Sequence, residues 1–314
     1  MIVASNVLEA IGNTPLVQLR KVVPPGSARV LAKLESTNPT GSMKDRMARA
    51  AIEAAEASGK LKPGSTVVEY TGGSTGASLA LVCAAKGYNL HIVTSDAFSR
   101  EKIDVMQAFG AQITCIPSDN KHITEMLIMK MVEAARTVSR QPGHWWFDQL
   151  NNEDATAGYY GLGKEIWKQT AGAVDAFVQS VGSAHSLNGV VAALRKHKPD
   201  LYAIAAEPAE SAVLSGNPKG SHKIEGIGIG FVPPRWKSDQ VDEIVSDTTE
   251  ASNRMCRRLA REEGIFAGTS SGLNVIAALQ VAERLGPDAT VVTLMIDSGL
   301  RYLSTDVYQT IESP

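Results

Sequence analysis

The chain has 314 residues, of which 44% are hydrophobic and 20% are charged, so it is long enough for one large domain or two smaller ones. Its formal net charge of −2 gives no electrostatic basis for binding nucleic acid or an anionic membrane. No apolar run approaches the roughly 18–20 residues that span a bilayer. The N-terminus also lacks the basic region of a signal peptide, so we expect a cytoplasmic protein.

Short β-rich runs alternate with alanine-rich helical patterns along the chain. Strands are predicted at residues 30–34, 66–70, 90–94, 112–116, 176–181, 202–206 and 290–296. Helices are predicted at residues 44–58, 75–87, 99–109, 121–139, 186–197, 248–263 and 271–285. Because strands separated by helices form right-handed crossovers, the pattern predicts an α/β fold with mostly parallel sheets.

Two stretches interrupt this alternation. Residues 140–165 are rich in glycine, tryptophan and amides, and we expect a crossing between two α/β units there. Residues 211–240 form a second long irregular segment, and loops of that length usually serve as lids or binding loops.

The cysteines and histidines predict no metal or redox site. Cys83 and Cys115 lie in apolar surroundings, so we expect small buried side chains rather than reactive thiols. The six histidines show no spacing typical of metal ligands.

Four loops of small polar residues lie at or near the carboxyl ends of predicted strands, where α/β sheets bind ligands. They are residues 38–46, which include Lys44, and residues 71–76, 182–189 and 268–272. Each precedes a predicted helix, whose N-terminus offers N–H groups and a positive dipole end to an anion. Alone, each loop also fits ordinary turn chemistry, Lys44 also fits a solvated charge, and none is a dinucleotide or P-loop motif. Together they predict a site for an anionic ligand.

The sequence resembles the cysteine synthase family, the O-acetylserine sulfhydrylase and cystathionine β-synthase relatives of pyridoxal phosphate fold type II, over nearly its whole length. The motifs that carry the resemblance are residues 11–16 (IGNTPL), 38–46 (similar to NPxGSxKDR), 207–216, 222–228 and 301–305 (RYLST). The resemblance implies two three-layer αβα domains with mostly parallel sheets, as in the tryptophan synthase β-like fold. A smaller, mobile N-terminal domain would comprise residues 1–12 and 36–148, and a larger C-terminal domain residues 13–35 and 149–314.

The resemblance also implies pyridoxal 5′-phosphate as cofactor. Lys44 would form a Schiff base with it and, once freed, would take the substrate's Cα proton as general base. Ser271 would face the pyridine nitrogen, where a neutral hydroxyl favours expulsion of a β-leaving group. The cofactor phosphate would be held by Gly182, Ser183, Ala184, His185 and Ser186.

The phosphate segment departs from the family's usual GTGGT. Ala184 and His185 replace two glycines, so we expect the backbone to reach the phosphate without positive φ angles. His185 would either add a donor beside the phosphate or point to solvent.

For the substrate, the resemblance assigns the α-carboxylate to the loop that follows the second predicted strand. The binding residues would be Thr71, Gly72, Gly73, Ser74, Thr75 and Gln149, with Gly228 at the substrate entrance. Ser74 would also contact the cofactor ring. Compared with the family's TSGNTG, Gly72 replaces a serine and Ser74 an asparagine. A hydrogen bond to a charged group is worth about 1.5–3 kcal/mol, enough to change substrate preference.

The reaction implied is β-replacement, first of all O-acetyl-L-serine plus sulfide giving L-cysteine and acetate. One alternative uses serine, or another activated serine, with homocysteine or a different nucleophile. Another is a weakly active regulatory member that binds a partner. The family further implies a homodimer and a C-terminal peptide of a serine acetyltransferase as a possible partner.

Overall fold

The computed structural model describes residues 3–120 and 123–309, and the chain divides into two compact units. Unit 1 comprises Met1–Ile11 and Asn38–Gly158, and unit 2 comprises Gly12–Thr37 and Tyr159–Pro314. The second division falls later than the expected border at residue 148. The reason is that helix α5 (Asp154–Ala157) packs against the first helix of unit 1.

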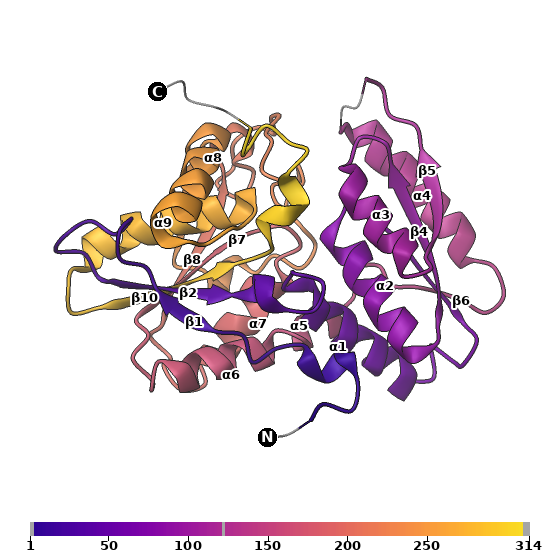
Figure 1. Ribbon diagram of the computed structural model, residues 1–314, viewed down its shortest axis with the longest axis horizontal. Coiled ribbons are helices and arrows are strands. Elements are labelled where there is room, and N and C mark those ends of the chain that lie inside the picture. Colours follow the sequence, from indigo (N-terminus) through magenta and orange to yellow (C-terminus); the bar gives the residue numbers. More distant parts are fainter. Residues whose placement is uncertain (1–2, 121–122, 310–314) are drawn as a thin grey trace. The chain divides into compact units, whose positions relative to one another are not determined.

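Unit 1 contains a four-stranded parallel sheet in the order β5-β4-β3-β6 (Figure 1). The strands are β3 (Thr66–Tyr70), β4 (Asn89–Ser95), β5 (Gln112–Ile116) and β6 (His144–Trp146). The main helices are α1 (Lys44–Ala57), α2 (Ser74–Lys86), α3 (Arg100–Ala108) and α4 (Glu125–Ser139). Leu127, Met131 and Ala135 form an apolar stripe on α4 that packs against β3 and β4. Figure 1 shows α2 and α3 on the opposite face of this sheet.

Unit 2 contains a six-stranded sheet in the order β1-β2-β10-β7-β8-β9, parallel except for β1. The strands are β1 (Leu16–Gln18), β2 (Arg29–Leu34), β7 (Ala176–Ser180), β8 (Tyr202–Pro208), β9 (Glu243–Asp247) and β10 (Thr290–Met295). The helices are α6 (Tyr160–Gln169), α7 (His185–Leu194), α8 (Thr249–Arg258) and α9 (Thr269–Leu285). One face of the sheet forms a core with α8 and α9, and α7 contacts β7. The predicted α/β class with mostly parallel sheets is confirmed.

All seven predicted strands are present, with their ends shifted by at most a few residues. The sequence missed β1, β6 and β9, and it missed α6, which begins inside the stretch expected to be only a crossing. The predicted helix at 121–139 begins at Glu125, and residues 121–122 lie outside the described part of the chain. After Arg258 the helical pattern continues as one π-helical turn, Leu259–Glu263. Short 3-10 helices occur at Val7–Ala10, Glu35–Thr37, Ala209–Ser211, Ser238–Gln240 and Gly299–Tyr302.

The cysteine prediction holds for one residue and is wrong for the other. Cys83 is buried, and burial raises the pKa of its thiol to about 12. Cys115 is exposed, because it lies on the edge strand β5, none of whose residues is fully buried. Within residues 3–120 and 123–309, no helix is long and apolar enough to cross a membrane. The same residues contain no cluster of three or more histidine, cysteine or acidic side chains that could hold a metal ion.

Candidate active site

Lys44 is the first residue of α1 and is held by a dense set of polar contacts around its neighbour Asp45. The Asp45 side chain is fully buried and accepts hydrogen bonds from the Thr40 N–H (2.8 Å), the Thr40 hydroxyl (2.5 Å) and the Ser78 hydroxyl (2.6 Å). The Ser42 hydroxyl oxygen accepts from the N–H of Lys44 (3.2 Å). Because Ser78 belongs to α2, these bonds fix the start of α1 beside the first turns of α2.

The loop that contains the predicted carboxylate-binding residues connects β3 to α2. Thr71 follows the strand directly, and its Oγ1 accepts from the N–H of Gly73 (3.1 Å). Ser74 is the first residue of α2, and Thr75 is 4% exposed. The first turn of a helix leaves N–H groups without intrahelical acceptors, so this loop is equipped to bind a carboxylate.

The glycines of this loop make room for side chains of the α3 segment. A Cβ on Gly72 would lie 2.2 Å from the Phe98 ring, and one on Gly73 would lie 2.7 Å from Cδ of Lys102. A Cβ on Gly76 would likewise lie 2.2 Å from the sulfur of Met106, four residues after Lys102. None of the three glycines has a φ in the left-handed region. The departure from serine at position 72 is therefore explained by the aromatic ring of Phe98, which fills the space a side chain would need.

Gln149 lies next to this loop because the strands that precede them are neighbours. Val68 of β3 pairs with Trp146 of β6, and both chains leave the sheet at the same edge. The Glu69 carboxylate joins them, accepting from the N–H of Tyr70 (2.9 Å) and the N–H of Gln149 (3.0 Å). Unit 1 thus brings Gln149 together with the loop 71–76.

Glu69 is a buried acid that the sequence analysis missed. Burial raises the pKa of its carboxyl to about 8; the two N–H donors lower this pKa in part, and the nearby charge of Asp148 raises it further. The signal in the sequence was a glutamate inside an otherwise apolar strand, TVVEY.

The predicted phosphate segment connects β7 to α7 in unit 2. Ala184 has a φ of +68°, so the expectation that this segment would avoid positive φ is wrong for Ala184. The helix begins at His185, and a left-handed residue followed by helical residues directs successive N–H groups into an anion-binding concavity. Ser183 and Ser186 are nearly buried, and His185 is 1% exposed, which rules out a side chain pointing to solvent.

The segment around Gly228 packs tightly against the phosphate segment. A Cβ on Gly182 would lie 2.4 Å from the carbonyl oxygen of Gly226. The N–H of Gly228 donates to the carbonyl oxygen of Val181 (3.1 Å). A small cavity of about 10 Å³ lies here, lined by residues that include Gly182, Glu207 and Gly228. A larger hollow of about 380 Å³ lies at β1 and β2 and contains none of the predicted site residues.

Ser271 lies in the first turn of α9 and is fully buried. Its Oγ accepts a hydrogen bond from the N–H of Ile296 (2.9 Å), just after β10, so its hydroxyl proton is left to be donated elsewhere. One turn further on, the Asn274 amide accepts from the N–H of Ser180 (2.6 Å) and donates to the carbonyl of Leu294 (2.8 Å). Asn274 therefore joins the end of β7 to that of its neighbour β10.

The sequence profile of pyridoxal-phosphate dependent enzymes matches residues 7–297. The chain belongs to this family. A cysteine synthase from Staphylococcus aureus is 40% identical over 306 residues, which cover 96% of each chain. The crystal structure of a cysteine synthase from Entamoeba histolytica is 36% identical with a TM-score of 0.92, covering 100% of this chain and 93% of that one. The crystal structure of an O-acetylserine dependent cystathionine β-synthase from Helicobacter pylori is 32% identical with a TM-score of 0.91, covering 98% of this chain and 100% of that one.

The residues of unit 2 fit the cofactor of this pyridoxal-phosphate dependent family. The phosphate segment combines the concavity at Ala184 with buried hydroxyls at Ser183 and Ser186, and residues 182–186 include no acidic side chain. Ser271 can donate its proton to an unprotonated pyridine nitrogen, because its oxygen already accepts from a backbone N–H. A neutral hydroxyl there does not keep the ring protonated as a carboxylate would.

Proposed function

We propose that this protein catalyses a pyridoxal phosphate-dependent β-replacement in which O-acetyl-L-serine loses acetate and gains sulfide to give L-cysteine. The observation that carries the proposal is the 40% identity to a cysteine synthase along 96% of both chains. The similarity to an E. histolytica cysteine synthase along the whole chain supports the same reaction.

Each unit supplies a part of the chemistry. When bound, the cofactor withdraws electrons from the substrate's Cα, so that a group on Cβ can leave. In unit 1, Nζ of Lys44 attaches the cofactor and later takes the proton from Cα. In unit 2, Gly182, Ser183, Ala184, His185 and Ser186 bind the phosphate. Ser271 donates its hydroxyl proton to the ring nitrogen.

The substrate is held by its carboxylate. The N–H and hydroxyl groups of Thr71–Thr75 at the start of α2 bind this group, and the side chain of Gln149 reaches it as well. Ser74 also contacts the cofactor ring, and Gly228 lines the entrance. These contacts fix the orientation of Cα toward the base, which is how a bound substrate gains rate from positioning.

Lys44→Ala tests the reaction and the role of its base together. We expect the wild-type protein to show a cofactor absorption band and to form cysteine from O-acetyl-L-serine and sulfide, and the variant to lose both. Lys60→Ala is the matched control, because Lys60 is an exposed lysine of unit 1. A wild-type protein that forms no cysteine, or a Lys44→Ala variant that forms it at the wild-type rate, would contradict the proposal.

A second candidate is β-replacement with homocysteine or another thiol as nucleophile, on serine or an activated serine. Two observations favour it: the departures at Gly72 and Ser74 in the carboxylate loop, and the similarity to the H. pylori enzyme. Measuring kcat/KM for sulfide and for homocysteine, each with O-acetyl-L-serine and with serine, decides between the two.

Assembly and location extend the proposal. We propose a cytoplasmic homodimer that can also bind the C-terminal peptide of a serine acetyltransferase. Sedimentation of the holoenzyme tests the dimer. Titration with a synthetic C-terminal peptide, followed by the cofactor's absorption, tests the partner.

A further inference from the structure

Glu69 connects two strand ends beyond the point where their backbone pairing stops. Val68 pairs with Trp146, and the N–H of Phe147 still donates to the carbonyl oxygen of Val68 (2.9 Å). After that, the Glu69 side chain takes over as acceptor. One carboxylate oxygen accepts from the N–H of Tyr70 and the other from the N–H of Gln149.

We propose that Glu69 is a positioning residue for recognition of the substrate's α-carboxylate, and that it acts through Gln149. This inference rests on the proposed function, in which Gln149 and the loop 71–76 bind that carboxylate. Glu69 itself is fully buried near the end of β3, and its bond to the N–H of Gln149 holds the turn after β6 beside β3 without contact to the substrate.

The turn that carries Gln149 needs such a support. Asp148 has a φ of +49°, a conformation that costs a non-glycine residue free energy and persists only where surrounding contacts enforce it. On its far side, the N–H groups of Asn151 and Asn152 donate to the carbonyl of Asp148 (3.0 and 2.9 Å). Directly after Asp148, the N–H of Gln149 donates to the Glu69 carboxylate, and this bond also stabilises the turn.

The geometry also explains why the residue is an acid. Two N–H donors converge on the two oxygens of one side chain, and only a carboxyl group of this length offers an acceptor to each of them. Glutamine has the same shape but would place its NH₂ group against one donor. Glu69→Gln is therefore expected to weaken the hold on the turn at Gln149 while keeping the packing.

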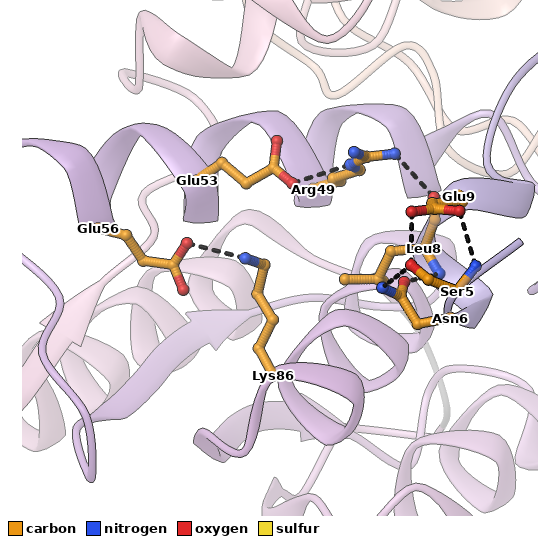
Figure 2. A network of polar contacts seen from close by, with 8 residues as sticks. All are labelled: Ser5, Asn6, Leu8, Glu9, Arg49, Glu53, Glu56 and Lys86. Carbon is orange, nitrogen blue, oxygen red and sulfur yellow. Dashed lines mark hydrogen bonds and ion pairs between the residues drawn. The ribbon is translucent and has the colours of Figure 1, made fainter.

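The control comes from the same unit. Glu56 on α1 accepts from Nζ of Lys86 (2.8 Å) and the hydroxyl of Tyr88 (2.9 Å), and Figure 2 shows its carboxylate directed at Lys86. Glu56→Gln makes the same chemical change to a carboxylate that also joins two chain segments. It does so away from the loop 71–76 and from Gln149.

The first measurement needs no substrate. Hydrogen exchange of residues 147–152 is compared among holoenzymes of the wild type, Glu69→Gln and Glu56→Gln. We expect faster exchange in Glu69→Gln and the wild-type rate in Glu56→Gln. Unchanged exchange in Glu69→Gln would overturn the proposal.

The second measurement is a double-mutant cycle on the KM for O-acetyl-L-serine. Glu69→Gln is expected to raise KM about tenfold, the equivalent of about 1.4 kcal/mol, with kcat nearly unchanged. If Glu69 acts through Gln149, the Glu69→Gln/Gln149→Ala double variant has the KM of Gln149→Ala alone. Additive effects would overturn the proposal, because they would show that Glu69 acts independently of Gln149.

Failure of the proposed function is distinguishable from failure of this inference. If the wild type does not turn over O-acetyl-L-serine, the reaction is wrong, and binding of L-serine is followed instead by the cofactor's absorption. The inference then predicts about tenfold weaker L-serine binding in Glu69→Gln and none of this weakening in Glu56→Gln. Equal affinity in Glu69→Gln and the wild type would overturn it.

Discussion

The two ligand loops share one architecture and use their small residues in opposite ways. In unit 1 the loop after β3 leads into α2, and in unit 2 the segment after β7 leads into α7. None of the glycines at 72, 73 and 76 is in the left-handed region, and all three provide space for side chains of residues 98–106. In unit 2 the left-handed backbone conformation falls on Ala184, which is not a glycine.

The difference shows that a ligand loop can need a small residue for either of two reasons. Either neighbouring atoms leave no space for a side chain, or the backbone adopts a conformation that a larger residue disfavours. Gly182 is needed for space, because a backbone carbonyl lies where a side chain at this position would be. Position 184 needs a left-handed backbone conformation, which alanine adopts only at a cost in free energy. Substitutions that add or remove one methyl group therefore separate the two uses.

The largest effect is expected from Gly182→Ala. The added Cβ would lie 2.4 Å from the carbonyl oxygen of Gly226, and backbone cannot rotate away as a side chain can. Overpacking of this kind costs about 3 kcal/mol at its upper range, which is more than a hundredfold in affinity. We expect most of the bound cofactor to be lost, as measured by its absorption after dialysis. Full cofactor retention would show that the segment has room to shift.

Gly72→Ser is expected to be milder, because the obstacle is the ring of a side chain. The Cβ would lie 2.2 Å from Phe98, which is half-buried and can rotate in part. A cost of about 1–2 kcal/mol predicts a KM for O-acetyl-L-serine raised roughly tenfold.

The Phe98→Ala substitution supplies the control for Gly72→Ser. Combined with Gly72→Ser it removes the obstacle, so the double variant is expected to recover much of the wild-type KM. A double variant as impaired as the sum of the singles would mean that the serine hydroxyl, and not the ring, causes the loss.

The two loops also differ in what anchors them, and pH separates these anchors. Glu69 is titratable, with its pKa raised by burial from 4.5 to about 8, whereas the amide of Asn274 does not titrate. Because the folded protein favours the protonated acid, this contribution to the free energy of unfolding is complete below about pH 4.5 and is lost as the pH rises to about 8. We expect the unfolding free energy of the wild type to fall over this range relative to that of Glu69→Gln.

Urea denaturation at several pH values measures this difference. Tyr70 and Asp148 lie beside Glu69 and are present in both proteins, so the two pH profiles differ by the charge of Glu69. Parallel pH profiles for the two proteins would show that Glu69 is ionised in the folded state at neutral pH.

The sequence was informative where a feature depends on a local pattern. Apolar runs predicted seven of the eight described strands that have five or more residues, because burial of a parallel strand leaves a continuous hydrophobic segment. The eighth, β9, was missed because acidic and hydroxyl side chains interrupt its apolar residues. The three-residue strands β1 and β6 have no such pattern and exist only because a neighbouring strand supplies their hydrogen bonds. Likewise, Glu69 and Phe98 could not be assigned, since their roles depend on strand register and on how the α3 segment packs against the loop.

Ala184 shows the same limit for backbone conformation. Its small side chain suggested that the phosphate segment had abandoned the left-handed geometry, because alanine rarely adopts it. The start of α7 and the burial of Ser183 and His185 enforce it instead. Tertiary contacts thus impose a backbone conformation that alanine disfavours, at a position where this conformation directs N–H groups toward an anion.

The smallest effect is expected from Ala184→Gly, and it tests that interpretation directly. Glycine relieves the left-handed strain, worth about 1–2 kcal/mol, but it also increases the entropy of the unfolded chain by about 0.4–1 kcal/mol. We therefore expect a gain in unfolding free energy of at most about 1.6 kcal/mol, with cofactor binding unchanged, since the N–H groups keep their directions. A marked loss of stability would mean that the methyl group of Ala184 contributes packing, because at 3% exposure it is surrounded by other atoms.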